Sequence, residues 1–259
     1  MEHRDNIKLS ERLAMSAGMV TAGSSVADVG CDHAHTCIWL VKHGVVPKAI
    51  AMDVRSGPLS HSEANIMLYG LDEHIKTRLS DGLDALLPGE TDTIIRAGMG
   101  GTLTVQILER GLDKAKAAKE LILQSQSDLG MVRRFLREHG FCIREEKMCK
   151  EFGKFYTSMK VVYGPEFISG TDTVTDTKDI VAVSNHGKDE ILISVYDEFG
   201  EYLLKNKNDI LYEVLLILKE KNKRILEKIT GEGSEESLER KAFFEREKEQ
   251  ISKALEFFK

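Results

Sequence analysis

Short apolar runs alternate with longer segments of helical spacing over residues 25–124. Four runs are apolar almost throughout, which predicts strands of a parallel sheet buried on both faces: residues 25–30, 48–53, 93–98 and 120–124. Three helix-length segments lie between them, each closed by a glycine: residues 34–44, 58–70 and 102–111. Pro58 suits a first helical position, and the glycines suit C-terminal caps. This order predicts a doubly wound α/β sheet.

The order changes after a predicted helix at residues 128–139. Residues 141–148 and 155–163 predict two strands with no helix between them, and the intervening KEFGK predicts a hairpin turn. A parallel sheet that ends in a hairpin is typical of class I methyltransferases rather than dehydrogenases, by analogy of fold. We therefore expect an α/β, Rossmann-like class I methyltransferase domain over residues 1–165.

The remaining chain, residues 166–259, predicts a C-terminal helical domain. From residue 201 apolar side chains recur every seven positions, and the repeat resumes after a break at residues 230–236. The two segments predict an antiparallel helical hairpin of coiled-coil type, with a continuous first helix about 45 Å long. Asn208 and Asn222 occupy seam positions, where a polar group fixes the register. The pattern leaves open whether this hairpin projects as an arm or caps the core.

Composition narrows the class of protein. Hydrophobic residues make up 42% of the 259 residues and charged residues 30%, the balance of a globular protein. No apolar run approaches the roughly 20 residues of a membrane span, and the polar N-terminus lacks a signal peptide, so we expect a cytoplasmic protein. The four cysteines form no C-x-x-C pair, and reduced thiols are expected.

Charge is unevenly distributed along the chain. The first 165 residues carry 21 basic and 21 acidic side chains, so the net charge of −6 lies wholly in the remainder. A neutral domain can still carry a local basic face, and this balance therefore neither indicates nor excludes RNA binding.

The loop after the first predicted strand carries Gly30 and Asp32. A dinucleotide site requires G-x-G-x-x-G there, because the backbone must close around a pyrophosphate, which an acidic loop would repel. Such a loop suits the ammonium and sulfonium groups of S-adenosylmethionine. Asp53 ends the second strand, where an acid accepts hydrogen bonds from ribose hydroxyls. Asp81 and Gly82 follow a further strand, the third in chain order, which is expected between the helix at residues 58–70 and the run at residues 93–98; there they could bind the adenine amine.

Residues 97–101, A-G-M-G-G, end the fourth predicted strand at the edge where open α/β sheets bind ligands. Three glycines within four residues exceed what a tight turn requires and indicate close approach of the backbone to a ligand. Enzymes that methylate the adenine amine typically place [DNS]-P-P-[YFW] here, and this stretch has no proline. Methylation of adenine N6 is therefore disfavoured.

Five segments between Leu9 and Tyr156 stand out together: LSERL, ADVGCDHA, IIRAGMGGTL, LILQSQSD and GKFY. With the following EFGEYLL, they resemble the bacterial tRNA (adenine-N1)-methyltransferase family that modifies adenine 22. The chain departs from the family pattern at residues 35–37 and 123–126. The resemblance implies S-adenosylmethionine as methyl donor, tRNA as substrate, and a C-terminal coiled-coil domain. At matching positions it assigns cofactor contacts to Asp28, Gly30, Asp32, His33, Asp53, Asp81, Gly82, Gly98, Met99 and Gly100.

The chemistry that this resemblance implies needs little from the enzyme beyond alignment. Adenine N1 carries a lone pair at neutral pH and attacks the methyl group directly, provided that the base is unpaired. Methylation makes the base cationic, so a group that accepts from its N6 amine would stabilise the transition state. The catalytic candidates for that role are Asp28, Asp32 and Gln124.

Two other functions remain open from the sequence. The same cofactor pocket would serve a methyltransferase acting on a small molecule or a protein. A catalytically silent RNA-binding or scaffold protein would use the helical arm for assembly. No oligomeric partner is evident in the sequence.

A C-x-H-x-H-x-C pattern at residues 31–37 raises the question of zinc. Strict alternation brings side chains together only on a continuous strand, and a helix is predicted to begin within this stretch. We therefore expect no metal site.

Basic residues suggest where RNA phosphates would bind, although a solvated helix face is the alternative for each cluster. One candidate face comprises Arg133, Arg134, Arg137, Lys114, Lys116 and Lys119. A second stripe of helical spacing comprises Arg4, Lys8 and Arg12.

Overall fold

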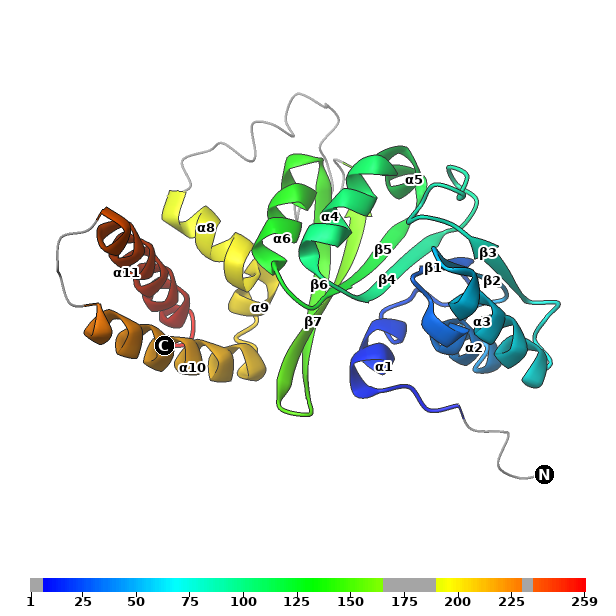
Figure 1. Ribbon diagram of the computed structural model, residues 1–259, viewed down its shortest axis with the longest axis horizontal. Coiled ribbons are helices and arrows are strands. Elements are labelled where there is room, and N and C mark those ends of the chain that lie inside the picture. Colours follow the sequence, from blue (N-terminus) through cyan, green and yellow to red (C-terminus); the bar gives the residue numbers. More distant parts are fainter. Residues whose placement is uncertain (1–6, 165–189, 230–234) are drawn as a thin grey trace.

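A seven-stranded sheet forms the centre of the molecule in the computed structural model, which describes residues 7–164, 190–229 and 235–259 (Figure 1). The strand order is β3-β2-β1-β4-β5-β7-β6, and β7 runs antiparallel to both of its neighbours. The strands are β1 Val26–Val29, β2 Ala49–Asp53, β3 Ile75–Leu79, β4 Thr93–Met99, β5 Glu120–Ser125, β6 Phe141–Glu151 and β7 Lys154–Tyr163. The predicted Rossmann-like methyltransferase fold is confirmed, including the hairpin that ends the sheet.

Helices cover both faces of this sheet (Figure 1). One layer comprises α1 Glu11–Ala17, α2 His35–Lys42 and α3 Ser56–Leu68, and the other comprises α4 Gly101–Arg110, α5 Leu112–Ala117 and α6 Leu129–Glu138. Successive strand residues serve opposite layers, so Ile95 packs in the first core cluster and Ile94 in the second. Because both faces are covered, all four residues of β1 are buried, which explains the continuous apolar runs.

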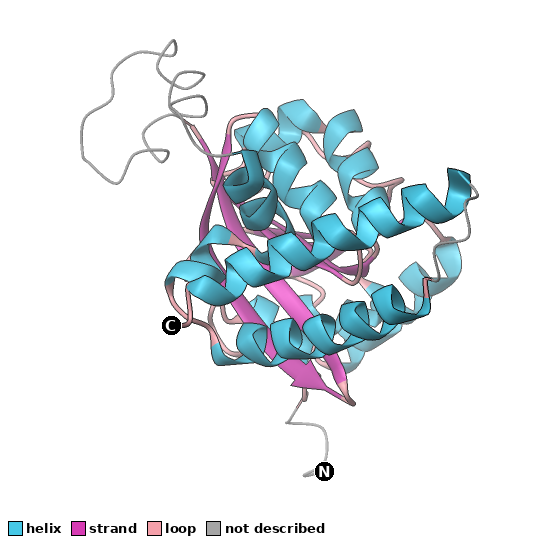
Figure 2. Cartoon of the chain, turned by 90° about the vertical axis from the view of Figure 1, so that its left-hand side faces the viewer, coloured by secondary structure: helices cyan, strands magenta, loops and turns pink. Residues whose placement is uncertain are grey.

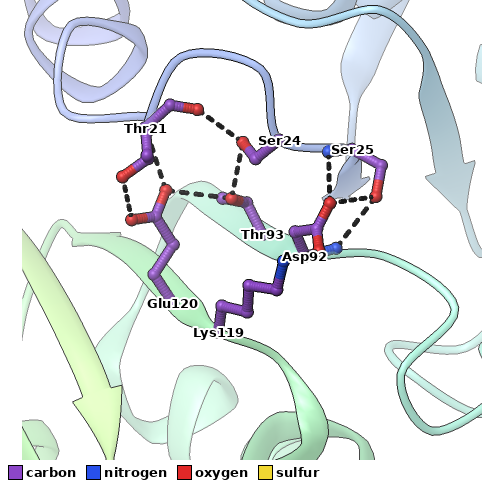
Figure 3. Close-up of polar contacts among 7 residues, drawn as sticks. All are labelled: Thr21, Ser24, Ser25, Asp92, Thr93, Lys119 and Glu120. Atoms are coloured by element: carbon purple, nitrogen blue, oxygen red, sulfur yellow. Dashed lines mark hydrogen bonds and ion pairs between the residues drawn. The ribbon is translucent and has the colours of Figure 1, made fainter.

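A network of hydrogen bonds closes the amino-terminal edge of the sheet (Figure 3). Glu120 accepts from the backbone nitrogen and hydroxyl of Thr21, at 2.8 and 2.6 Å, and from the Thr93 hydroxyl at 2.9 Å. Asp92 accepts from the backbone nitrogen and hydroxyl of Ser25, at 2.9 and 2.8 Å. Burial raises the pKa of Glu120, but these hydrogen bonds outweigh it and the net shift is downward. The carboxylates at this edge are therefore fully engaged in holding strand ends together.

In the part of the chain that the structure describes, four helices follow the sheet: α8 Glu190–Phe199, α9 Glu201–Lys205, α10 Asp209–Lys228 and α11 Glu235–Glu256. The last two lie side by side and antiparallel (Figure 2). Asn222 donates to the Phe244 carbonyl at 2.9 Å towards one end of the pair, while Lys207 donates to the Lys259 carbonyl at 3.0 Å at the other. The predicted antiparallel helical hairpin is thus confirmed.

The continuous first helix of that hairpin was predicted wrongly. The chain turns at Gly200, with φ of 88°, and again at Lys207, with φ of 49°, which separates α8, α9 and α10. Asn208 lies outside the seam and caps α10, accepting from the Leu211 nitrogen at 3.0 Å. Asn222 is buried in the seam as expected.

The predicted boundary between residues 165 and 166 falls outside the described residues and remains a proposal. Among the described helices, none combines the length and the apolar character that a membrane span requires.

Candidate cofactor and substrate site

The carboxyl ends of β1 and β4 lie side by side at the point where the strand order reverses. The helix after β1 covers one face of the sheet and the helix after β4 covers the other. In open α/β sheets this divergence leaves a crevice that binds ligands. The predicted site residues lie near the carboxyl ends of these strands or in the turns that follow them.

Gly30 begins the loop after β1, and its φ of 79° favours glycine. A Cβ atom there would collide with the terminal methyl group of Met99, so the β1 and β4 loops touch at this point. Asp32, His33 and Ala34 follow with φ values of 21°, 62° and 57°, a left-handed course that non-glycine residues rarely adopt. Such a loop exposes backbone groups close to a ligand, as strained backbone at binding sites does.

Asp28 is buried beneath α2, where the Cys37 thiol donates to its Oδ2 atom at 3.8 Å. Burial raises its pKa from 3.8 to about 7, the Cys37 thiol lowers it, and the nearby Asp53 carboxylate raises it. Its carboxyl group therefore gains from any positive charge that enters the crevice. Asp32 differs: its side chain is 77% exposed and lies 3.4 Å from His33 Nε2.

Asp53 ends β2 and is 7% exposed. Its Oδ1 atom accepts from the Arg55 backbone nitrogen at 2.9 Å, which orients the carboxylate. Within the described residues nothing bonds to Oδ2. An oriented, half-satisfied carboxylate at this strand end has the chemistry to accept hydrogen bonds from a diol.

Asp81 and Gly82 lie in the turn after β3, which packs on α4. Arg110 pairs with the Asp81 carboxylate at 2.9 Å and donates to its carbonyl at 2.7 Å. The hydrogen bond from Arg110 lowers the pKa of Asp81. Gly82 has φ of 59°, and a Cβ atom there would lie 3.0 Å from Ile107. The turn is therefore fixed by a residue, Arg110, that no sequence motif indicated.

The glycine-rich turn after β4 needs its glycines for two different reasons. Gly98 has φ of 85°, and Gly101 approaches the loop after β5 so closely that a Cβ would lie 2.5 Å from the Ser127 carbonyl oxygen. Gly100 is the N-cap of α4, and a Cβ there would lie 3.2 Å from the Ser127 hydroxyl. Packing on the loop after β5 thus explains Gly101 and contributes at Gly100, whereas the positive φ explains Gly98.

Gln124, the third catalytic candidate, is fully buried on β5. Its Oε1 atom accepts from the Gly98 backbone nitrogen at 3.1 Å and from Arg12 at 3.4 Å. The oxygen is therefore committed to the protein, and the three candidates differ sharply: Asp28 and Gln124 are buried, whereas Asp32 is exposed. The structure does not present them as one constellation around a base.

The residues of the C-x-H-x-H-x-C pattern separate into thiols inside and imidazoles outside. Cys31 lies 3.6 Å from the Ser62 hydroxyl, whereas the rings of His33 and His35 stack 5.6 Å apart at the surface. Burial raises the pKa of Cys31 to about 12, which keeps the thiol protonated. Over residues 7–164, 190–229 and 235–259, no cluster of three or more ligand side chains could hold a metal ion.

Arg133 and Arg137 of the predicted phosphate-binding face on α6 are engaged within the chain. Arg133 is 4% exposed and donates to Glu146 at 2.9 Å and to the Asp197 and Glu198 carbonyls at 2.9 and 2.7 Å. Arg137 pairs with the Asp197 carboxylate at 2.8 Å. These arginines attach α8 to the sheet domain. Of the lysines assigned to this face, Lys119 pairs with Asp92 at the opposite edge of the sheet.

Known proteins resemble this chain in sequence and in fold. Residues 9–159 match the methyltransferase domain family. The chain belongs to this family. The match ends in β7 and therefore covers the whole sheet edge described above.

The tRNA (adenine(22)-N(1))-methyltransferase of Bacillus subtilis is 36% identical over 152 residues, which make up 59% of this chain and 64% of that enzyme. The crystal structure of the B. subtilis m1A22 tRNA methyltransferase TrmK covers 96% of this chain and 100% of its own, with a TM-score of 0.81 and 27% identity. A Streptococcus pneumoniae protein whose proposed activity is tRNA m1A22 methylation, solved with S-adenosyl-L-methionine, covers the same shares with a TM-score of 0.71 and 30% identity.

Proposed function

We propose that this protein acts in the cytoplasm and transfers the methyl group of S-adenosylmethionine to N1 of adenine 22 in tRNA. One observation carries the proposal. Asp28 and Asp53 approach each other beside the Gly30 loop, at the reversal point of a methyltransferase-family sheet. Relatives named for tRNA m1A22 methylation share this fold over 96% of the chain.

The residues at this edge fit a cationic nucleoside cofactor. Gly30 lets the loop after β1 pass close to Met99, and Asp53 offers a carboxylate oxygen to ribose hydroxyls. Burial raises the pKa of Asp28, and an ammonium or sulfonium group beside this carboxylate would favour its ionised form. S-adenosylmethionine, when bound, supplies an electrophilic methyl group to the acceptor nitrogen. Gly98, Met99 and Gly100 are proposed to contact the cofactor, beside the methyl acceptor.

The chain's own contribution is alignment and electrostatics. N1 of an unpaired adenine needs no deprotonation, so the proposed reaction requires no general base and no covalent enzyme intermediate. The Gln124 side chain holds the Gly98 backbone nitrogen at 3.1 Å, which keeps the turn after β4 in a fixed position. We therefore propose that Gln124 positions the turn, in place of the base contact expected from sequence.

The test is methylation of a tRNA transcript with labelled S-adenosylmethionine, followed by nucleoside analysis. We expect 1-methyladenosine from the wild-type transcript and none from a transcript with guanine at position 22. Asp53→Ala serves as the enzyme control, because losing two charge-assisted bonds weakens cofactor binding about 30- to 150-fold. Methylation of a small molecule or protein but not of tRNA would replace the proposed substrate. Folded protein that binds tRNA without methylating any acceptor would support the scaffold alternative.

A further inference from the structure

Arg12 of α1 lies where four of the family-like segments meet. Its Nη1 atom donates to Gln124 on β5 at 3.4 Å, and its guanidinium lies 5.7 Å from the ring centre of Tyr156 on β7. A Cβ atom on Gly98 would lie 3.2 Å from the same Nη1 atom. The LSERL, AGMGG, LILQS and GKFY segments thus converge on one cation beside the glycine-rich turn.

The guanidinium has hydrogen-bonding capacity to spare. Arginine carries five N–H donors, and the contacts of Arg12 engage Nε, 3.7 Å from Glu151, and Nη1. Among the described residues no partner takes Nη2. The side chain is 25% exposed, in contrast to the 4% of Arg133, which is consumed by intramolecular bonds.

Attachment of α1 to the sheet does not explain this arginine. The Ser16 and Ser158 hydroxyls share a buried hydrogen bond of 2.8 Å, which joins α1 to β7 directly. The Glu11 backbone nitrogen also donates to Glu151 at 2.6 Å. With α1 held at two other points, the Arg12 side chain is left for a contact that the isolated chain does not provide.

We propose that Arg12 binds the backbone phosphate next to the target nucleotide of the RNA, with Tyr156 supporting its guanidinium from behind. This inference rests on the proposed function and names one residue that holds its substrate. A guanidinium fork matches phosphate geometry and forms two parallel hydrogen bonds to it. Because its Nη1 atom lies near Gly98, a phosphate bound by Arg12 would lie beside the turn at which the acceptor base reacts.

The position of Arg12 favours RNA over the other anion of the reaction, the carboxylate of the cofactor. The acids of the proposed cofactor site lie at the ends of β1, β2 and β3. The hydrogen-bond, ring and ion-pair partners of Arg12 lie on β5, β7 and β6, beyond β4 in the strand order. Arg12 therefore lies on the opposite side of β4 from the acids of the proposed cofactor site, where the RNA can reach it.

The experiment compares Arg12→Gln and Arg12→Lys with the wild type. It measures tRNA affinity at several salt concentrations, KM for tRNA, kcat, and S-adenosylmethionine affinity. Lys76→Ala is the matched control, since it removes one exposed positive charge at the start of β3, at the opposite edge of the sheet. Arg12→Gln should weaken tRNA binding about ten- to a hundredfold and reduce the salt slope by about 0.7–0.9, the share of one phosphate.

Arg12→Lys should recover part of the tRNA affinity, because it keeps the charge but not the fork. Cofactor affinity should stay within about twofold in both variants, a margin of roughly 0.4 kcal/mol. Unchanged tRNA affinity and salt slope in folded Arg12→Gln would overturn the proposal, as would a loss confined to cofactor affinity. Wild-type protein that binds tRNA but methylates nothing would refute the proposed reaction and leave the binding comparison valid. Absence of tRNA binding by the wild type would overturn both.

Discussion

Replacing Asp28 by asparagine should change the pH dependence of stability in a direction that burial dictates. The folded-state pKa is about 7 against an ordinary value of 3.8, so the folded chain holds this proton more tightly than the unfolded chain. Stability from this group is therefore lost as pH rises from about 4 to 7 and stays constant above. At 1.36 kcal/mol per pH unit the full loss is about 4 kcal/mol, and about 3 kcal/mol of it falls between pH 5 and pH 8.

Asp28→Asn lacks the ionisable group, so its stability relative to the wild type should rise by about 3 kcal/mol between pH 5 and pH 8. Urea unfolding of both proteins at each pH measures this, and the double difference cancels every other titrating group. Asp72→Asn, at an exposed position, is the control and should show no such change. A difference between Asp28→Asn and the wild type that does not vary with pH would refute the reasoning from burial.

The same variant connects Asp28 to the cofactor. If S-adenosylmethionine binds beside the ionised carboxylate, wild-type affinity should rise about tenfold from pH 6 to pH 8, following the ionised fraction of a group with pKa near 7. The pH dependence of Asp28→Asn gives the contribution of the cofactor's own titration. Parallel pH profiles for the two proteins would place the cofactor's charge away from Asp28.

Three further substitutions test single contacts. Gly30→Ala should lower cofactor affinity at least tenfold, as calorimetric titration would measure. Gly44→Ala is the control, because Gly44 has a similar φ of 67° and open space around it. This control should keep its cofactor affinity and lose only the stability that the backbone strain costs, about 1–2 kcal/mol, as thermal unfolding would show. Arg96→Met should raise the stability at pH 7.5 by roughly 1–3 kcal/mol, because this buried guanidinium has no hydrogen-bond partner among the described residues and burial lowers its pKa to about 10. A lower Tm would contradict this. Arg133→Met should destabilise by about 3–5 kcal/mol in urea, because Glu146 stays buried without its cation, and a second change, Glu146→Leu, should restore part of the loss.

The sheet was predictable because its strands are buried on both faces. In an α/β fold a continuous apolar run is stable as a strand that helices cover on both faces. Ile94 and Ile95 are an example, because these neighbouring residues pack in opposite core clusters. The acids after the strands were predictable for the same reason, since strand ends fix where the following residues lie. Their burial was not: Asp28 and Asp32 are four residues apart, yet one lies beneath α2 and the other faces solvent.

The helical repeat misled where two short helices share one core. Leu204 and Leu211 keep the seven-residue spacing although the chain turns between them, because both side chains pack in the same buried cluster with Ile251. Spacing records which face is buried and carries no information on whether the backbone continues as one helix. The turn depends on a left-handed Lys207 and the Asn208 cap, which are local features that a repeat does not reveal.

A cluster of basic residues in the sequence likewise does not reveal whether their charges are paired within the protein, as Arg133 and Arg137 of α6 are. Arg133 of α6 donates to carbonyl groups at the carboxyl end of α8, which attaches the helical arm, α8 to α11, beside the loop after β5. The arm also borders a cleft of about 520 Å³, with Ser127 on one wall and Leu211 on the other. Deletion from Gly200 onward would leave α8 in place while removing Leu211 and Ile251, which cover its buried Phe199. Such a protein should unfold or aggregate for reasons unrelated to RNA.

A chain that ends at Gly164 removes α8 as well and leaves the methyltransferase family match intact. It should keep cofactor affinity while its KM for tRNA rises, and full tRNA efficiency in that shorter chain would show that the arm serves another purpose than holding RNA.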